Sequence, residues 1–106
     1  MINREKWASL SLLEQMGNIS SEVGRAINSR DNPARRDGAI ARALDLFEAT
    51  ATCYSGLRLR EILRARDEFL RLFYDDATDF RGVEKYFHQF AVAARRIKIP
   101  TLKLNA

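Results

Sequence analysis

The fold is decided by the stretch from Ser11 to Arg30, which reads SLLEQMGNISSEVGRAINSR. Ser11 and Glu14 have the spacing of a capping box, in which each side chain accepts a hydrogen bond from the other residue's backbone amide. Apolar residues then recur at steps of four and three from Leu12 to Ala26, so they share one stripe of a helix. Glycine destabilises a helix interior by up to ~1 kcal/mol relative to alanine. The small residues that interrupt this helix therefore favour the close approach of another helix or chain; they are Gly17, Ser20, Ser21 and Gly24.

Three further amphipathic segments follow the first, and each break between them is short. Asn32 and Pro33 form a typical helix start, because asparagine caps well and proline suits the first helical position. We predict helices at residues 11–30, 33–52, 57–74 and 79–97, with Thr78 or Asp79 capping the last. Residues 1–10, which include Trp7, are expected to form a short lead-in that folds over one end, and residues 98–106 a frayed tail. The sequence thus predicts one all-α domain over 1–106, an antiparallel up-and-down four-helix bundle.

The amino-acid composition limits which bonds, metal sites and membrane segments this chain can form. The chain has 106 residues, of which 46% are hydrophobic and 30% charged, as expected for a globular domain with one core. The lone cysteine and the lone histidine exclude an internal disulfide and the usual structural zinc sets within one chain. We therefore expect no metal and no cofactor, and we expect Cys53 to lie in the core or an interface. No long apolar run indicates a signal peptide or a membrane span, so we expect a cytoplasmic protein.

Arginine is the most prominent candidate for function. The chain carries 18 basic and 14 acidic residues, a net charge of +4, and most of its basic residues are arginine. Arg60, Arg64 and Arg71 share one face of the predicted helix 57–74. Guanidinium groups bind phosphate through two parallel hydrogen bonds, so we predict a phosphodiester surface. Its residues are Arg58, Arg60, Arg64, Arg66 and Arg71, with Arg35 and Arg36 as helpers.

Two alternatives to this surface stay open. The arginines can instead pair with neighbouring acids, as Arg64 with Glu68, Asp67 with Arg71 and Arg60 with Glu61, on a protein–protein interaction scaffold. The second alternative is an enzyme. Arg81 and His88 lie about 10 Å apart along one helix face, and this pair resembles the Arg-x6-His motif of HEPN-domain ribonucleases, which cleave RNA without metal. Gly82 departs from that motif, because a polar residue usually follows its arginine.

Aromatic residues are concentrated in the last two predicted helices. Phe69, Phe73 and Tyr74 lie in one, and Phe80, Tyr86, Phe87 and Phe90 in the other. Most of them are expected in the core. Any excess that stays exposed would mark a subunit interface, and together with the small residues near Gly17 this favours homo-oligomerisation.

The run from Gln15 to Ala26 also carries a family resemblance. Residues 19–24, Ile-Ser-Ser-Glu-Val-Gly, resemble the first-helix signature of the four-helix-bundle family of ribosomal intervening-sequence proteins. That family includes the accessory variability determinant of diversity-generating retroelements. The resemblance implies a basic, ring-like homo-oligomer, often a pentamer, that binds a reverse transcriptase and its template RNA. It implies a non-enzymatic accessory protein with RNA as its partner.

Overall fold

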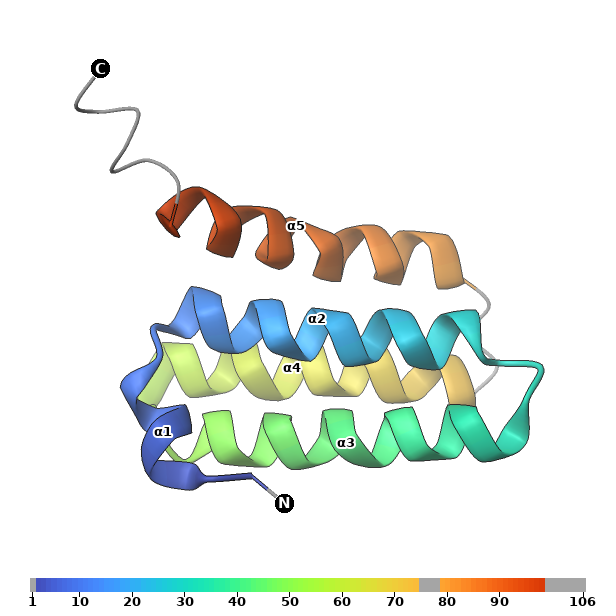
Figure 1. Cartoon of the computed structure of the whole chain (residues 1–106), viewed down its shortest axis with the longest axis horizontal. Helices are drawn as coiled ribbons and strands as arrows, with labels where there is room; N and C mark the ends of the chain where they lie inside the picture. Colours follow the sequence, from blue (N-terminus) through green and yellow to red (C-terminus); the bar gives the residue numbers. More distant parts are fainter. Residues whose placement is uncertain (1, 75–78, 99–106) are drawn as a thin grey trace.

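A computed structural model describes residues 2–74 and 79–98, with side chains up to residue 93 in the second range. Its helices are α1 (Arg4–Ser9), α2 (Leu12–Asn28), α3 (Pro33–Ala51), α4 (Gly56–Tyr74) and α5 (Phe80–Lys98). The described residues include no strand, which confirms the all-α prediction. In Figure 1, α2 and α4 run in one direction and α3 and α5 in the opposite direction.

The predicted helices agree with the observed ones to within two residues, and the capping signals explain why. Ser11 and Glu14 form the capping box at the start of α2, and the Asn32 side chain accepts from the Arg35 amide ahead of α3. The Asp79 carboxylate accepts from the Gly82 amide at the start of α5. Thr78, the other residue predicted for this cap, lies outside the described residues. Lys98, predicted in the tail, is instead the last residue of α5, and the rest of that tail also lies outside them.

The lead-in forms a short helix of its own, α1, and folds over one end as expected. Asn3 caps it, and its Trp7 is buried. The Trp7 indole Nε1 donates to the Thr50 hydroxyl at the end of α3, 2.9 Å away. The Gln15 side chain of α2 donates to the Trp7 carbonyl at 2.8 Å. These contacts come from distant parts of the chain, so tertiary packing holds a helix that is too short to persist alone.

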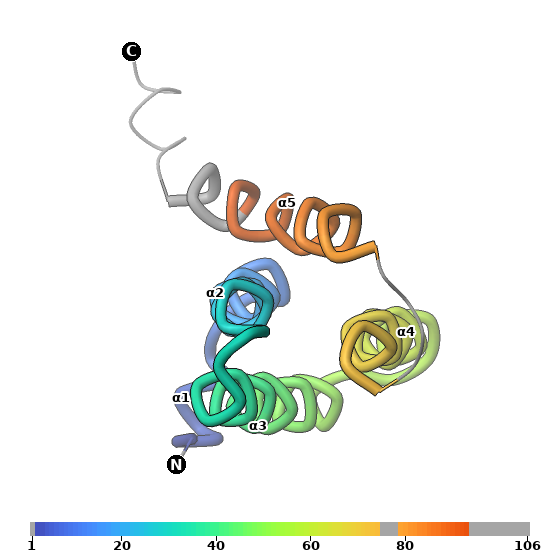
Figure 2. Tube along the Cα trace, turned by 90° about the vertical axis from the view of Figure 1, so that its right-hand side faces the viewer, coloured from blue at the N-terminus to red at the C-terminus, as the bar shows by residue number. Residues whose placement is uncertain are grey.

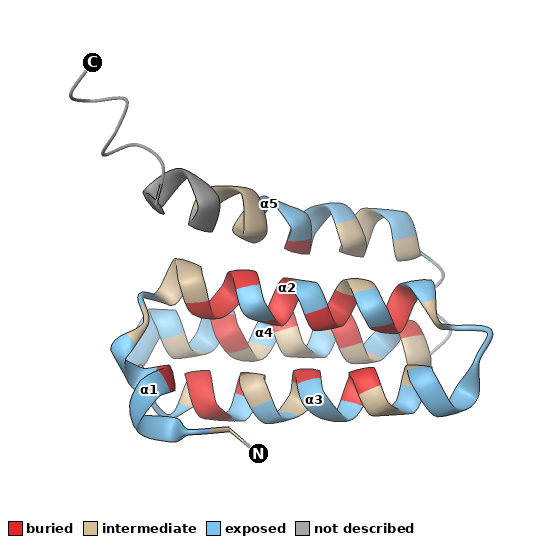
Figure 3. Cartoon of the chain, viewed as in Figure 1, coloured by how far each residue is buried: buried red, intermediate tan, exposed pale blue. Residues whose placement is uncertain are grey.

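The core is aromatic at its centre. Phe47 of α3, Phe69 of α4 and Phe87 of α5 are at most 1% exposed, and their ring centroids are 6.1 to 6.5 Å apart. Buried residues lie mainly on the sides of α2, α3 and α4 that face one another (Figure 3). Among the described side chains of α5, only Phe87 is buried. Of the predicted aromatic group, Phe69 and Phe87 are therefore buried in the core, and Phe73, Phe80 and Phe90 are partly buried against it. Tyr74 and Tyr86 remain exposed.

The helices do not pack against one another equally closely. α2 has its most extensive contacts with α5 and α3, whereas α4 and α5 make few contacts with each other. Ser20 of α2 is buried, and its Oγ lies within hydrogen-bond distance of the Phe87 carbonyl of α5. Such a small side chain lets α2 and α5 approach closely, whereas phenylalanine rings pack between α4 and α5. Figure 2 views α2 and α4 nearly end-on, with α4 set apart from α2 and with α5 running obliquely across the top.

The expectation of close approach is met at only part of the small-residue stretch. Gly17 and Ser20 are buried, but a Cβ atom added at Gly24 would meet no atom within 4 Å. Gly24 therefore does not serve contact with the part of the chain that the structure describes. Cys53, expected in the core or an interface, is exposed, although its Sγ donates to the Ala49 carbonyl at 3.4 Å. The core prediction for Cys53 is wrong because α3 ends at Ala51, which leaves Cys53 in the connecting loop.

Candidate nucleic-acid interface

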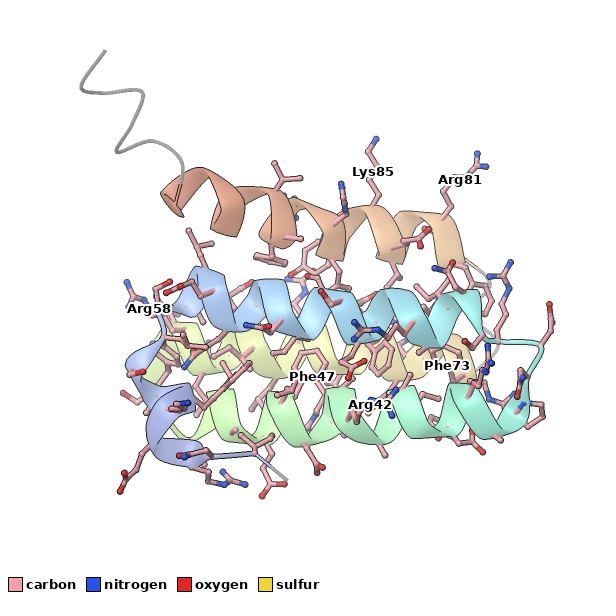
Figure 4. All side chains as sticks on the ribbon, in the orientation of Figure 1. Arg42, Phe47, Arg58, Phe73, Arg81 and Lys85 are labelled. Atoms are coloured by element: carbon pink, nitrogen blue, oxygen red, sulfur yellow. The ribbon has the colours of Figure 1, made fainter. Side chains whose placement is uncertain are left out.

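The predicted arginine surface lies on α4, which is one continuous helix from Gly56 to Tyr74. Arg60, Arg64 and Arg71 are exposed, and the helical repeat places them on the side away from Ile62 and Phe69 in the core. Arg58 is exposed near the start of the helix, at one end of the molecule (Figure 4). The helix carries five arginines and three acidic residues, so its own net charge is positive.

Ion pairing divides these arginines into two groups. Arg66 lies 3.9 Å from Asp67, and Arg71 lies 3.7 Å from Glu68. No carboxylate in ranges 2–74 and 79–98 forms an ion pair with Arg58, Arg60 or Arg64. Neither the Arg64–Glu68 nor the Arg60–Glu61 pair considered from the sequence therefore forms. Three exposed guanidinium groups remain available on the first half of α4.

Arg66 is less accessible than Arg58, Arg60 and Arg64. Its side chain is partly buried, and its Nε has no hydrogen-bond partner among the described atoms. With its guanidinium also near Asp67, Arg66 offers fewer free donors to a phosphate than Arg58 or Arg60.

The two helper arginines stand at the start of α3, which is the end of the molecule opposite Arg58 (Figure 1). The Arg36 Nε lies 3.1 Å from the Asp37 carboxylate, and its Nη1 donates to the Arg30 carbonyl. Arg35 is exposed and has no ion pair with a described carboxylate. The structure thus separates these two residues from the arginines at the start of α4.

Sequence reasoning did not group Arg25 and Arg42, which the structure brings together on Glu22. The Glu22 side chain is only 10% exposed, and its two oxygens accept from Arg25 Nη1 at 2.7 Å and Arg42 Nε at 2.8 Å. Figure 4 places Arg42 in the seam between α2 and α3. One signal was present in the sequence, since Glu22 lies seven residues after Gln15 on the inner flank of α2. A buried glutamate at such a position requires a cationic partner.

The proposed ribonuclease pair lies on the outer side of α5. Arg81 and His88 are both exposed, and Arg81 points away from the other helices (Figure 4). His88 borders a shallow hollow whose lining comes from α5 alone and does not include Arg81. No second element in the described part of the chain therefore faces this pair to position a substrate. The ribonuclease alternative stays a prediction.

A groove separates α4 from α5, and its polarity changes along its length. Near the start of α4 it is apolar, with a cavity of about 310 Å³. Its lining includes Leu12, Leu13, Met16, Leu57, Ile62 and Phe90, with Arg58, Glu61 and Tyr86 at its polar margin. Further along, the groove is polar, and its lining includes Arg64, Glu61, Glu68 and Asp79. Burial raises the pKa of the Tyr86 hydroxyl above its usual value. The charges of Glu61 and Glu68 raise it further, and the charge of Arg64 opposes them.

The described residues contain no group of three or more histidine, cysteine, aspartate or glutamate side chains arranged to hold a metal ion. Across ranges 2–74 and 79–98, no helix combines the length and apolar character needed to cross a membrane.

Comparisons of the chain with protein-family models, with curated proteins and with solved structures gave no match. The resemblance carried by residues 15–26 therefore stays a prediction.

Proposed function

We propose that this chain is a non-enzymatic, basic, up-and-down four-helix bundle that forms a homo-oligomer and binds RNA, or a complex of RNA with a reverse transcriptase. It acts in the cytoplasm as an accessory factor of a retroelement. The observation that carries the RNA proposal is the set of exposed guanidinium groups on α4, Arg58, Arg60 and Arg64, which have no ion pair with a described carboxylate.

Charge and geometry both support RNA phosphates as the ligand of these arginines. An arginine without a carboxylate partner keeps its donors for a bound anion, and its planar fork matches two phosphate oxygens. Arg60 and Arg64 are one helical turn apart, so both can contact the same backbone segment. Arg71 extends this face by two further turns, although it also pairs with Glu68. Arg66 and Arg36 contribute less, because each pairs with a neighbouring aspartate.

The apolar half of the α4–α5 groove supports the homo-oligomer. Leu57 is 75% exposed beside this groove, and Tyr86 is 37% exposed on its other side. A second copy that covers these residues removes apolar surface from water, which stabilises an oligomer. The pentameric count rests on the family resemblance alone, and the molar mass in solution tests it.

The test compares two charge-matched triple variants in RNA binding at several salt concentrations. The first variant is Arg58→Gln, Arg60→Gln and Arg64→Gln on α4. The control is Arg4→Gln, Lys6→Gln and Lys85→Gln, which removes the same charge from exposed positions on α1 and α5. The affinity of a protein for single-stranded RNA falls as salt rises, and each lost phosphate contact makes the negative slope of log K against log salt shallower by about 0.7.

We expect the α4 variant to bind RNA more weakly and to have a negative salt slope that is shallower by about 1.5 to 2. The control should change both quantities much less, because its charges do not touch the bound RNA. Equal effects of the two variants would show that only net charge matters and would reject the α4 surface. RNA cleavage in the presence of a chelator, if abolished by His88→Ala, would support the ribonuclease alternative instead.

A further inference from the structure

A second basic feature lies where α2 ends and α3 begins. The two helices enclose a hollow of about 390 Å³ that α4 and α5 do not line. Arg25, Asn28 and Ser29 line it from the end of α2, and Arg35, Gly38 and Arg42 line it from α3. Three guanidinium groups from two helices therefore border one concave space.

Two of these guanidinium groups are held in place by a buried carboxylate. Glu22 uses one oxygen for Arg25 Nη1, at 2.7 Å, and the other for Arg42 Nε, at 2.8 Å. Each arginine spends one nitrogen on Glu22, so the remaining N–H donors of both groups stay available. Gly38 makes room for this arrangement, because an added Cβ would lie 3.3 Å from Arg42 Nη1. The pair is therefore ordered before any ligand arrives.

The hollow keeps an excess of positive charge. Three arginines line it, and Glu22 pairs with two of them, Arg25 and Arg42. Asp37, which lies on α3, is paired with Arg36. Arg35 has no ion pair with any described carboxylate. The end of α2 and the start of α3 meet at this end of the hollow, so their dipoles oppose each other and the excess positive charge comes from the arginines. These groups favour an anion over a neutral ligand.

We infer that this hollow is a phosphate-binding site and that it takes a backbone phosphate of the bound RNA. Phosphate suits it because a tetrahedral oxyanion can accept hydrogen bonds from several guanidinium groups at once. The identification of the ligand as RNA rests on the proposed function, whereas the phosphate site itself rests on Arg25, Arg35 and Arg42.

The experiment uses the full chain and two probes, inorganic phosphate and a short single-stranded oligoribonucleotide. Amide chemical shifts report where phosphate binds, and fluorescence anisotropy reports RNA affinity. The first variant combines Arg25→Gln with Arg42→Gln. Because it leaves Glu22 buried without a partner, a second variant, Arg35→Gln, removes an arginine that Glu22 does not contact. Arg4→Gln is the charge-matched control.

We expect phosphate to shift amides near residues 25–29 and 34–42, and Arg35→Gln to weaken phosphate and RNA binding about tenfold each. Arg4→Gln should leave both nearly unchanged. The inference is overturned if phosphate shifts no amides in these segments, or if Arg35→Gln binds both probes as tightly as the wild type.

The two proposals fail in different ways. If Arg35→Gln leaves RNA affinity intact while the α4 triple variant weakens it, RNA binding stands and the phosphate site is not part of it. If the wild type binds inorganic phosphate at the hollow but binds no RNA, the site stands and the RNA function is wrong.

Discussion

Gly24 offers a sharp test of how the small-residue stretch of α2 is used. It lies in the middle of a helix, and an alanine Cβ there would have no atom within 4 Å. Alanine favours the helix over glycine by about 0.5–1 kcal/mol, because the unfolded chain loses less conformational freedom. With open space at the site, no steric penalty offsets this gain. Gly24→Ala should therefore stabilise the protein by about that amount.

The measurement is thermal unfolding followed by circular dichroism, together with the molar mass from light scattering. A gain of this size corresponds to a rise in Tm of about 2–8 °C for a domain of this length. The molar mass should not change, because the α4–α5 groove rather than Gly24 is the proposed subunit contact.

Gly56 is a matched control that isolates the backbone. It too has no atom within 4 Å of an added Cβ, but its φ is +63°. Gly56→Ala should destabilise by about 1–2 kcal/mol, since an L side chain is strained in this region. If Gly24→Ala also lowers Tm, or reduces the molar mass, the reasoning is refuted, and Gly24 instead faces a second copy of the chain.

Three further predictions concern single contacts. Ser20→Ala should destabilise by about 1 kcal/mol in urea unfolding, because its hydroxyl bonds the Phe87 carbonyl of α5; an unchanged unfolding midpoint would contradict this contact. Asp79→Ala should lower Tm through a loss of about 1 kcal/mol, since its carboxylate caps the Gly82 amide; an unchanged Tm would mean that the cap contributes nothing. The raised pKa of Tyr86 means that its stabilising effect is full below pH about 10 and is lost as the pH rises through the folded-state value. Tyr86→Phe should therefore reduce the alkaline loss of stability in urea unfolding, and equal losses in both proteins would argue against it.

The helices were predictable because their signals are local. Capping residues and apolar repeats act within a few positions of one another, so Ser11, Asn32 and Asp79 located helix starts correctly. The separate helix α1 was not predicted, because its six residues are held by Trp7 contacts to distant Thr50 and Gln15. No local pattern reports such contacts.

The candidate site was predictable only in part, for the same reason. Helical period alone placed Arg60 and Arg64 on an outer face, and that placement is confirmed. Which arginine forms an ion pair depends on side-chain rotamers and on how closely the helices approach. The helical repeat in the sequence determines neither. Arg42 meets Glu22 from another helix, 20 positions away in the chain. The arginine-lined hollow therefore became visible only when α2 and α3 were placed together.

The two arginine surfaces differ in rigidity, and this difference predicts different kinetic roles. Arg25 and Arg42 are held by Glu22 in the seam of two closely packed helices, so they lose little side-chain entropy when they bind a phosphate. Arg58 and Arg60 project from α4 without a described ion pair, and they attract a polyanion from a distance but must become ordered on contact.

Neutralising the α4 arginines should therefore mainly slow RNA association, and this effect should shrink as salt rises. Arg42→Gln at the hollow, which leaves Arg25 paired with Glu22, should mainly speed dissociation, because it removes an already ordered contact that acts once the RNA is bound. Stopped-flow binding at two salt concentrations separates the two rate constants. If both variants change only the association rate, the hollow holds no phosphate in the complex, and its arginines act only through their charge.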